Sequence, residues 1–234
     1  MYAQTMSTAP HTPRTEIIVV SFNQPYYEAF TVGCVAKNTK HPYDLTVHRN
    51  LPGVSLAKCW NMLIERSTAD YICLLNPDTA VAKGWLGLMV DSLEAGCCAV
   101  VPSSNAVFLS QIDTPFPKEV SNIETINNFA SGLEYGAECL RTASAMCVLF
   151  RREDWLAAGR FDEEFMLYGE DTEFFWRLVK KTGRTVTWRK DAYVHHYKAR
   201  CTSKAAAEGL DLAAIRRESE RMVNEKTDLD IRHV

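Results

Sequence analysis

The chain has 234 residues, of which 47% are hydrophobic, and its formal net charge is −3 at pH 7. This composition predicts a single globular domain with one sizeable core and excludes a disordered chain. The small net charge and the lack of a long basic block give no reason to expect nucleic acid or an anionic membrane as a partner, so small molecules or proteins are expected instead.

The cysteines and the apolar segments indicate in which cellular compartment the protein is expected. None of the eight cysteines forms a Cys-x-x-Cys pair, and several lie within apolar runs, which favours reduced thiols and a cytoplasmic protein. Residues 1–15 lack the apolar core of a signal peptide, and the sequence has no run of about eighteen apolar residues that would predict a transmembrane segment. We therefore expect a soluble protein with a flexible tail over residues 1–15.

Strands and helices alternate over residues 16–102. Short β-branched runs predict strands, and apolar residues at helical spacing predict helices. The predicted strands are 16–22, 43–49, 70–76 and 97–102, and the helices between them are 26–39, 54–67 and 84–96. Such alternation is typical of an α/β fold with a mostly parallel, Rossmann-like sheet flanked by helices.

This alternation is lost in residues 103–140, which are rich in Ser, Asn, Pro and Gly. They predict a long loop region with at most one helix, and loops of that length in compact domains are usually functional or disordered. Regular elements are then expected as a strand at 144–152, helices at 153–159 and 170–183, and two short strands within 185–197. The charged, alanine-rich segment from Ser203 onward favours a further helix.

Polar residues follow two of the predicted strands directly. Ser21 and Asn23 follow the first strand, and Asn76 and Asp78 follow the third. Because ligands of an open parallel sheet collect beyond the carboxyl ends of its strands, these residues are candidates for function. Asp78 suits a turn or a helix cap, and it equally suits a ligand of a divalent cation that is held against a diphosphate.

Two further groups lie near the C-terminal end of the predicted domain. Glu170 and Asp171 open a predicted helix, where acids interact favourably with the helix dipole; the alternative is a general base that takes a proton from an attacking hydroxyl. His195 and His196 end the last predicted strand. Since neighbouring side chains of a strand face opposite sides, at most one of them is expected to join a carboxylate in a manganese site.

Three stretches carry a resemblance to a known family. They are "IIVVSFN" from Ile17, "YICLLNPDT" from Tyr71, and "GRFDEEFMLYGEDTEFFWRLVKKTGRTVTWRKDAYVHHY" from Gly159. Together they resemble the family 2 glycosyltransferases with a GT-A fold, particularly the bacterial rhamnosyltransferase-like branch, over residues 16–198. The third stretch is the most specific of the three.

The resemblance implies an inverting, metal-dependent transferase that moves a hexosyl group from a nucleoside-diphosphate sugar to an acceptor hydroxyl. Asp78 and His196 would bind Mn²⁺ or Mg²⁺, and Asp171 would be the catalytic base with Glu170 beside it. The acceptor would be a saccharide, a lipid-linked molecule or a protein.

The resemblance also implies residues that contact the donor. Ser21 and Asn23 would border the nucleotide base and ribose, and Asn76 would occupy the first position of the family's Asp-x-Asp motif. The family's Asp-Asn-x-Ser segment after the second strand is replaced here by "TVHRNLPGVSLAKCWN". Arg49 and Asn61 in this segment are candidate donor contacts, and an ordinary solvated helix face is the alternative for each.

The implied organisation is one GT-A domain over residues 16–200, followed by a helical tail at 201–234. Within the domain, residues 16–102 would bind the nucleotide sugar, and residues 103–200 would form the acceptor and catalytic half, with a smaller subregion on the acceptor side. A catalytically weak nucleotide-sugar-binding protein on the same fold is one alternative, because Asn76 is neutral. A sugar-phosphate nucleotidyltransferase is less favoured, since no Gly-rich phosphate loop follows the first strand.

Overall fold

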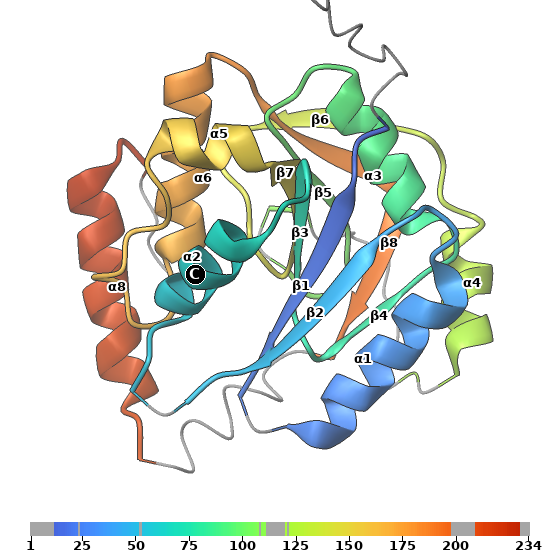
Figure 1. Ribbon diagram of the computed structural model, residues 1–234, viewed down its shortest axis with the longest axis horizontal. Helices are drawn as coiled ribbons and strands as arrows, with labels where there is room; N and C mark the ends of the chain where they lie inside the picture. Colours follow the sequence, from blue (N-terminus) through green and yellow to red (C-terminus); the bar gives the residue numbers. More distant parts are fainter. Residues whose placement is uncertain are drawn as a thin grey trace, which may run out of the picture.

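In the computed structural model, a mixed β-sheet lies between two layers of helices (Figure 1). The structure describes residues 12–22, 24–51, 53–107, 109–110, 120, 122–197 and 209–229. The strands are β1 (Thr15–Ser21), β2 (Asp44–Arg49), β3 (Tyr71–Leu75), β4 (Thr79–Val81), β5 (Ala99–Ser103), β6 (Ala137–Leu140), β7 (Cys147–Arg151) and β8 (Val186–His196). The helices are α1 (Pro25–Asn38), α2 (Leu56–Arg66), α3 (Trp85–Glu94), α4 (Ile123–Ala130), α5 (Arg152–Ala158), α6 (Glu170–Thr182) and α8 (Leu212–Lys226).

The strand order of the sheet is β2-β1-β3-β7-β5-β8-β4, and β6 pairs with β8. Strands β2, β1, β3, β5 and β8 run in one direction, whereas β7, β4 and β6 run in the other. The prediction of an α/β fold with a mostly parallel sheet is therefore confirmed. The antiparallel direction of β7 was not predicted, because a fully buried strand has the same apolar pattern in either direction.

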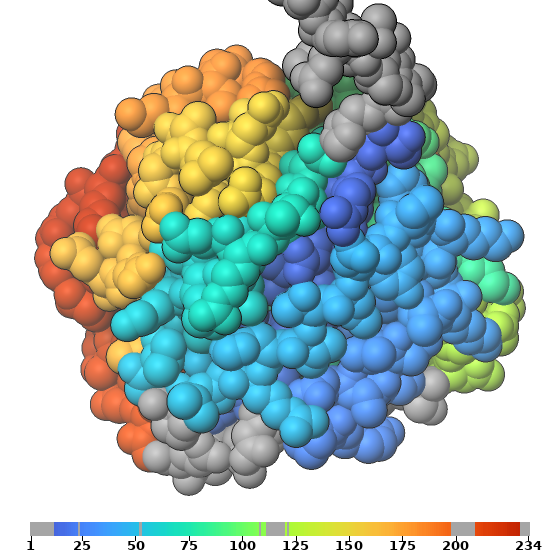
Figure 2. All heavy atoms as spheres, viewed as in Figure 1, coloured from blue at the N-terminus to red at the C-terminus, as the bar shows by residue number. Residues whose placement is uncertain are grey.

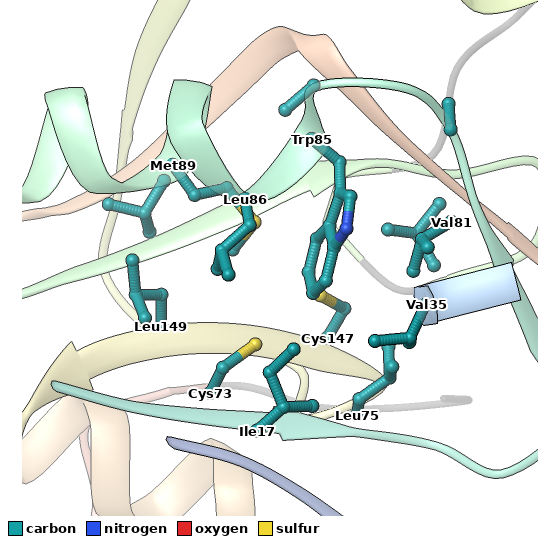
Figure 3. Close-up of a cluster of buried hydrophobic side chains, with 14 of the residues drawn as sticks. Ile17, Val35, Cys73, Leu75, Val81, Trp85, Leu86, Met89, Cys147 and Leu149 are labelled. Atoms are coloured by element: carbon teal, nitrogen blue, oxygen red, sulfur yellow. The ribbon is translucent and has the colours of Figure 1, made fainter. Parts of the chain in front are cut away.

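Alternating side chains of the central strands divide the core into two layers. Ile17 and Cys73 face α1 and α3, whereas Ile18 and Ile72 face α2, α5 and α6. Figure 3 shows the first layer, in which Trp85 of α3 lies above the side chains of β1, β3 and β7. A sheet that is buried on both faces explains why its strands read as continuous apolar runs.

Three parts of the sheet differ from the expectation. Residues 79–81, for which no strand is predicted, form the short strand β4, which pairs with β8 through Thr79 and His196. The region 103–140 contains helix α4, as expected, and also strand β6, which was not predicted. The two short strands expected within 185–197 are one strand, because β8 pairs with β5 and β6 along its first part and with β4 at its end.

The described residues include parts of both predicted tails and most of the cysteines. Most of the predicted tail lies outside the described residues, which begin at residue 12, and β1 already starts at Thr15. The part of the tail at 201–234 that the structure describes is helix α8 with the residues next to it. Among the described residues, none of the helices has the length and apolar character to cross a membrane, and every cysteine is a free thiol.

Candidate active site

A pocket of about 430 Å³ lies at the carboxyl ends of β1, β3 and β8. Its sheet side includes Ser21, Asn76, Asp78 and His196. Its other side is formed by residues 166–172, at the start of α6, and by side chains of α8. The pocket thus joins three segments that the sequence analysis identified separately, in the place where an open α/β sheet binds its ligands.

Asp78 and His196 meet inside this pocket. The Nε2 atom of His196 lies 3.3 Å from Oδ1 of Asp78, and Asp78 is only 3% exposed. The antiparallel pairing of β4 with the end of β8 brings the two residues together, and the backbone N–H of Tyr197 donates to the carbonyl of Asp78. A carboxylate and an imidazole therefore face one another at a buried point.

The ring of His196 is held in one orientation. Its Nδ1 lies 2.8 Å from the carbonyl oxygen of Ala106, and Asn105 bonds to both the backbone N–H and the carbonyl of His196. Because a carbonyl only accepts, Nδ1 carries a proton and donates it to Ala106, and Nε2 is the ring nitrogen that faces Asp78. A ring N–H bound to a backbone carbonyl is the usual support of a histidine that binds a metal ion.

The segment that carries Asp78 is fixed from the opposite side by Thr31 of α1. The hydroxyl of Thr31 lies within hydrogen-bond distance of the carbonyls of Pro77 and Thr79, and it accepts from the backbone N–H of Thr79. The Thr79 hydroxyl in turn donates to the carbonyl of Asn76. The turn at residues 76–79 is therefore held by buried bonds, which limits the movement of Asp78.

The donor set fits a divalent cation only in part. Asp78 and His196 supply one oxygen and one nitrogen ligand, a mixture that suits manganese. No group of three or more histidine, cysteine, aspartate or glutamate side chains that could hold a metal ion occurs in the described part of the chain. The remaining ligands would have to come from water or from the phosphates of a bound molecule.

Glu170 and Asp171 begin α6 on the far side of the pocket. Glu170 is only 3% exposed, and its Oε2 atom is buried without a hydrogen-bond partner among the described residues. Burial, followed by the charge of Asp171, raises the pKa of Glu170 to about 8. Glu170 is consequently a neutral carboxylic acid for the most part at pH 7.

Asp171 is supported as an anion. The backbone N–H of Ala145 donates to its Oδ2 at 2.8 Å, and the backbone N–H of Thr172 donates to its Oδ1 at 2.7 Å. Burial raises the pKa of Asp171, and these bonds act in the opposite direction. Oδ1 also accepts from the Thr172 hydroxyl at 3.3 Å, whereas the second lone pair of Oδ2 keeps the capacity to accept a proton from a ligand.

Comparisons with known proteins identify the fold. The structure is similar to the crystal structure of GalNAc-T7 with UDP, GalNAc and Mn²⁺, with a TM-score of 0.60 and 12% identity, over 80% of this chain and 44% of that one. It is also similar to the crystal structure of S. aureus TarS 1–349, with a TM-score of 0.55 and 14% identity, over 90% of this chain and 71% of that one. This chain has the GT-A glycosyltransferase fold. It spans less than half the length of GalNAc-T7.

Sequence comparison does not identify a family for this chain. No protein-family model matches the sequence, and no curated protein sequence matches it either. Membership of family 2 and of a rhamnosyltransferase-like branch therefore remains a prediction.

The residues predicted to contact the donor do not all lie at the pocket. Ser21 and Asn76 line the pocket, whereas Asn23 lies outside the described residues. Arg49 does not line the pocket; its guanidinium forms a two-point ion pair with Glu28 of α1. Asn61 also lies away from the pocket lining, where its buried side chain bonds to the backbone of Phe161.

The two histidines have different surroundings. His196 lines the pocket, whereas His195 is fully buried on the other face of β8. The Nδ1 atom of His195 lies 3.2 Å from the Tyr193 hydroxyl, and its ring packs edge-to-face against Tyr197. Alternation along β8 thus selects His196 as the residue beside Asp78.

One wall of the pocket is not predicted from the sequence. Arg216, Ser219 and Glu220 of α8 line it, as does Leu210 just before the helix. Residues 216, 219 and 220 have the i, i+3, i+4 spacing of one helix face, but that face is polar. A polar face is the usual pattern of a solvated helix, so only the structure reveals its contact with the pocket.

Proposed function

We propose that this chain is an inverting, metal-dependent glycosyltransferase that transfers a sugar from a nucleoside-diphosphate sugar to an acceptor hydroxyl. The main observation is that one pocket holds both the Asp78–His196 pair and the Glu170–Asp171 pair. The GT-A fold supports this proposal, as does the presence of UDP, GalNAc and Mn²⁺ in the GalNAc-T7 structure.

Asp78 and His196 are the residues that would hold Mn²⁺ or Mg²⁺. The cation would supply positive charge next to the diphosphate that departs from the sugar. Asp78 and His196 line the pocket together with Asn76, which has a neutral amide where the family carries an acid. The donor diphosphate is accordingly expected near the turn at residues 76–79.

Asp171 is the proposed general base. Its carboxylate takes the proton of the acceptor hydroxyl while the hydroxyl oxygen forms a bond to the anomeric carbon and the bond from that carbon to the diphosphate oxygen breaks. The backbone N–H groups of Ala145 and Thr172 keep the carboxylate fixed during this transfer. A single displacement of this kind inverts the anomeric configuration.

Glu170 is proposed to act beside the base as an uncharged group. With a pKa near 8, it keeps its proton at neutral pH, and this leaves Asp171 as the ionised member of the pair. Two neighbouring carboxyl groups with separate protonation states are a common arrangement in enzymes that need an acid and a base. The buried Glu170 carboxyl is then available to form a hydrogen bond with the acceptor.

The nucleotide is proposed to bind at the sheet edge near Ser21 and Asn76. Asn50 also lines this part of the pocket, and its backbone N–H donates to the carbonyl of Ser21 at 2.8 Å. The acceptor would be a saccharide, a lipid-linked molecule or a protein that presents a hydroxyl group.

Donor hydrolysis tests the proposal without a known acceptor. The protein is incubated with manganese and a panel of UDP-, GDP- and TDP-sugars, and free nucleoside diphosphate is measured. Slow release that EDTA abolishes is the expected result. Donor binding without release, even when diverse acceptors are added, would favour the catalytically weak binding protein, and release of pyrophosphate would favour nucleotidyl transfer.

A further inference from the structure

The C-terminal helix α8 packs against the loop that leads into the proposed base. This loop, residues 161–169, follows α5 and ends at Gly169, directly before Glu170. Figure 2 shows the red atoms of α8 against the yellow-orange atoms of this loop at the left of the molecule. The described contacts between the two segments come from one stripe of α8.

Val223 forms the apolar centre of this contact. It is fully buried and packs with Phe165, which is itself fully buried. A Cβ atom placed on Gly169 would lie 2.9 Å from Cγ2 of Val223 and 3.1 Å from Cε1 of Phe165. The backbone of Gly169 therefore packs closely against these two side chains, which leave no room for a Cβ atom.

Polar contacts on both sides of Val223 hold the same loop. The hydroxyl of Ser219 donates to the carbonyl of Leu167 at 3.0 Å, and Lys226 pairs with Asp162 and Glu164. Residues 219, 223 and 226 are spaced i, i+4 and i+7, so they share one face of the helix.

The loop adopts a backbone conformation that needs support. Tyr168 has φ 69° and Gly169 has φ 83°, both in the left-handed region. A non-glycine residue in that region is strained and persists only where the surroundings fix it. The guanidinium of Arg216 lies 4.9 Å from the centre of the Tyr168 ring, which adds a fourth contact from α8.

We propose that α8 is a working part of the active site, in which Val223 and Lys226 are positioning residues that hold Asp171 at the geometry needed for proton transfer. This inference rests on the proposed function. The loop leads into the first turn of α6, so a displacement of Gly169 displaces Glu170 and Asp171. Because a shift of about 1 Å at a catalytic group can lower a rate about 100-fold, these contacts are expected to control the rate of transfer.

Kinetics of point variants test this role in the full chain. Val223→Ala and Lys226→Ala are expected to lower kcat for donor hydrolysis by about tenfold and about threefold, with KM for the donor unchanged within about twofold. Lys226→Arg is expected to restore the rate. The matched control is Arg221→Ala, because the ion pairs of Arg221 within the described residues are with Glu218 and Glu225 of the same helix. Unchanged kcat in folded Val223→Ala and Lys226→Ala would overturn the proposal.

Amide hydrogen exchange provides a measurement that does not need activity. In Val223→Ala and Lys226→Ala, exchange at residues 165–171 is expected to speed up by about tenfold or more, because the local opening of the loop becomes easier. Arg221→Ala is expected to leave exchange in this segment unchanged. If exchange increases but the wild type releases no nucleotide, the proposed function fails while the positioning by α8 stands; if exchange is unchanged, the positioning itself is wrong. Ser219→Ala removes a smaller contact and replaces Val223→Ala should that variant fail to fold.

Discussion

Oδ1 of Asp78 lies 3.3 Å from Nε2 of His196, at the point where the short strand β4 pairs with the end of β8. This relationship joins the turn after β3 to the last strand of the sheet, and it places a carboxylate and an oriented imidazole on the pocket wall. The two side chains form the part of the site that we propose to bind the cation.

The first prediction concerns Asp78→Asn, which keeps the shape of the side chain and removes its charge. The manganese concentration that gives half-maximal donor hydrolysis is expected to rise by about tenfold or more, since a hard carboxylate ligand is lost. A manganese titration of the hydrolysis rate measures this, with the exposed Asp91→Asn as the control. An unchanged manganese requirement would return Asp78 to the role of a turn residue.

The second prediction concerns Thr31, whose hydroxyl holds the turn that carries Asp78. Thr31→Val keeps the volume and leaves the buried carbonyls of Pro77 and Thr79 without this donor. We expect a loss of about 1 to 3 kcal/mol in the free energy of unfolding, measured with urea. The exposed Thr125→Val should change it by less than about 0.5 kcal/mol, and equal losses in the two variants would contradict the structural role of Thr31.

The third prediction concerns the pH dependence of stability through Glu170. Its pKa is raised from 4.5 to about 8 in the folded protein, so between these values the folded state keeps a proton that the unfolded state releases. The contribution of Glu170 to the free energy of unfolding therefore falls as the pH rises from about 5 to 8. Glu170→Gln removes this loss.

Urea unfolding of the wild type and Glu170→Gln at pH 5 and pH 8 measures the effect. Relative to the wild type, the variant is expected to gain stability on the order of 3 kcal/mol between the two pH values, at about 1.4 kcal/mol per pKa unit. Glu134→Gln, at an exposed position, controls for the loss of one carboxylate. The same stability difference at both pH values would show that Glu170 is not a buried acid.

Much of the fold follows from local sequence patterns. The apolar runs of β1 and β3 and the glycine that ends α6 predict elements close to those observed. The direction of β7 does not follow from its sequence, and β4 has only three residues, too few for a recognisable pattern. Both depend on pairing with strands that are distant in the sequence.

The candidate site follows the same division. Asp78, Asp171 and His196 were identified because short motifs place them at the ends of predicted elements. Arg49 and Asn61 are predicted from their place in the segment that replaces the family's Asp-Asn-x-Ser motif, but in the structure they bond to Glu28 and Phe161 away from the pocket lining. The wall formed by α8 can be recognised only from the tertiary structure, because a polar helix face has the same sequence pattern in solvent and at a pocket.

Release of nucleoside diphosphate by the wild type and by Asp171→Asn, with the same donor and manganese, tests the central claim most directly. The account predicts release by the wild type and a rate at least about 100-fold lower in the variant, with donor binding retained in a thermal-shift measurement. Equal rates in the two proteins would contradict the assignment of Asp171 as the base, and a wild type that releases no nucleotide from any donor would contradict the proposed transfer reaction.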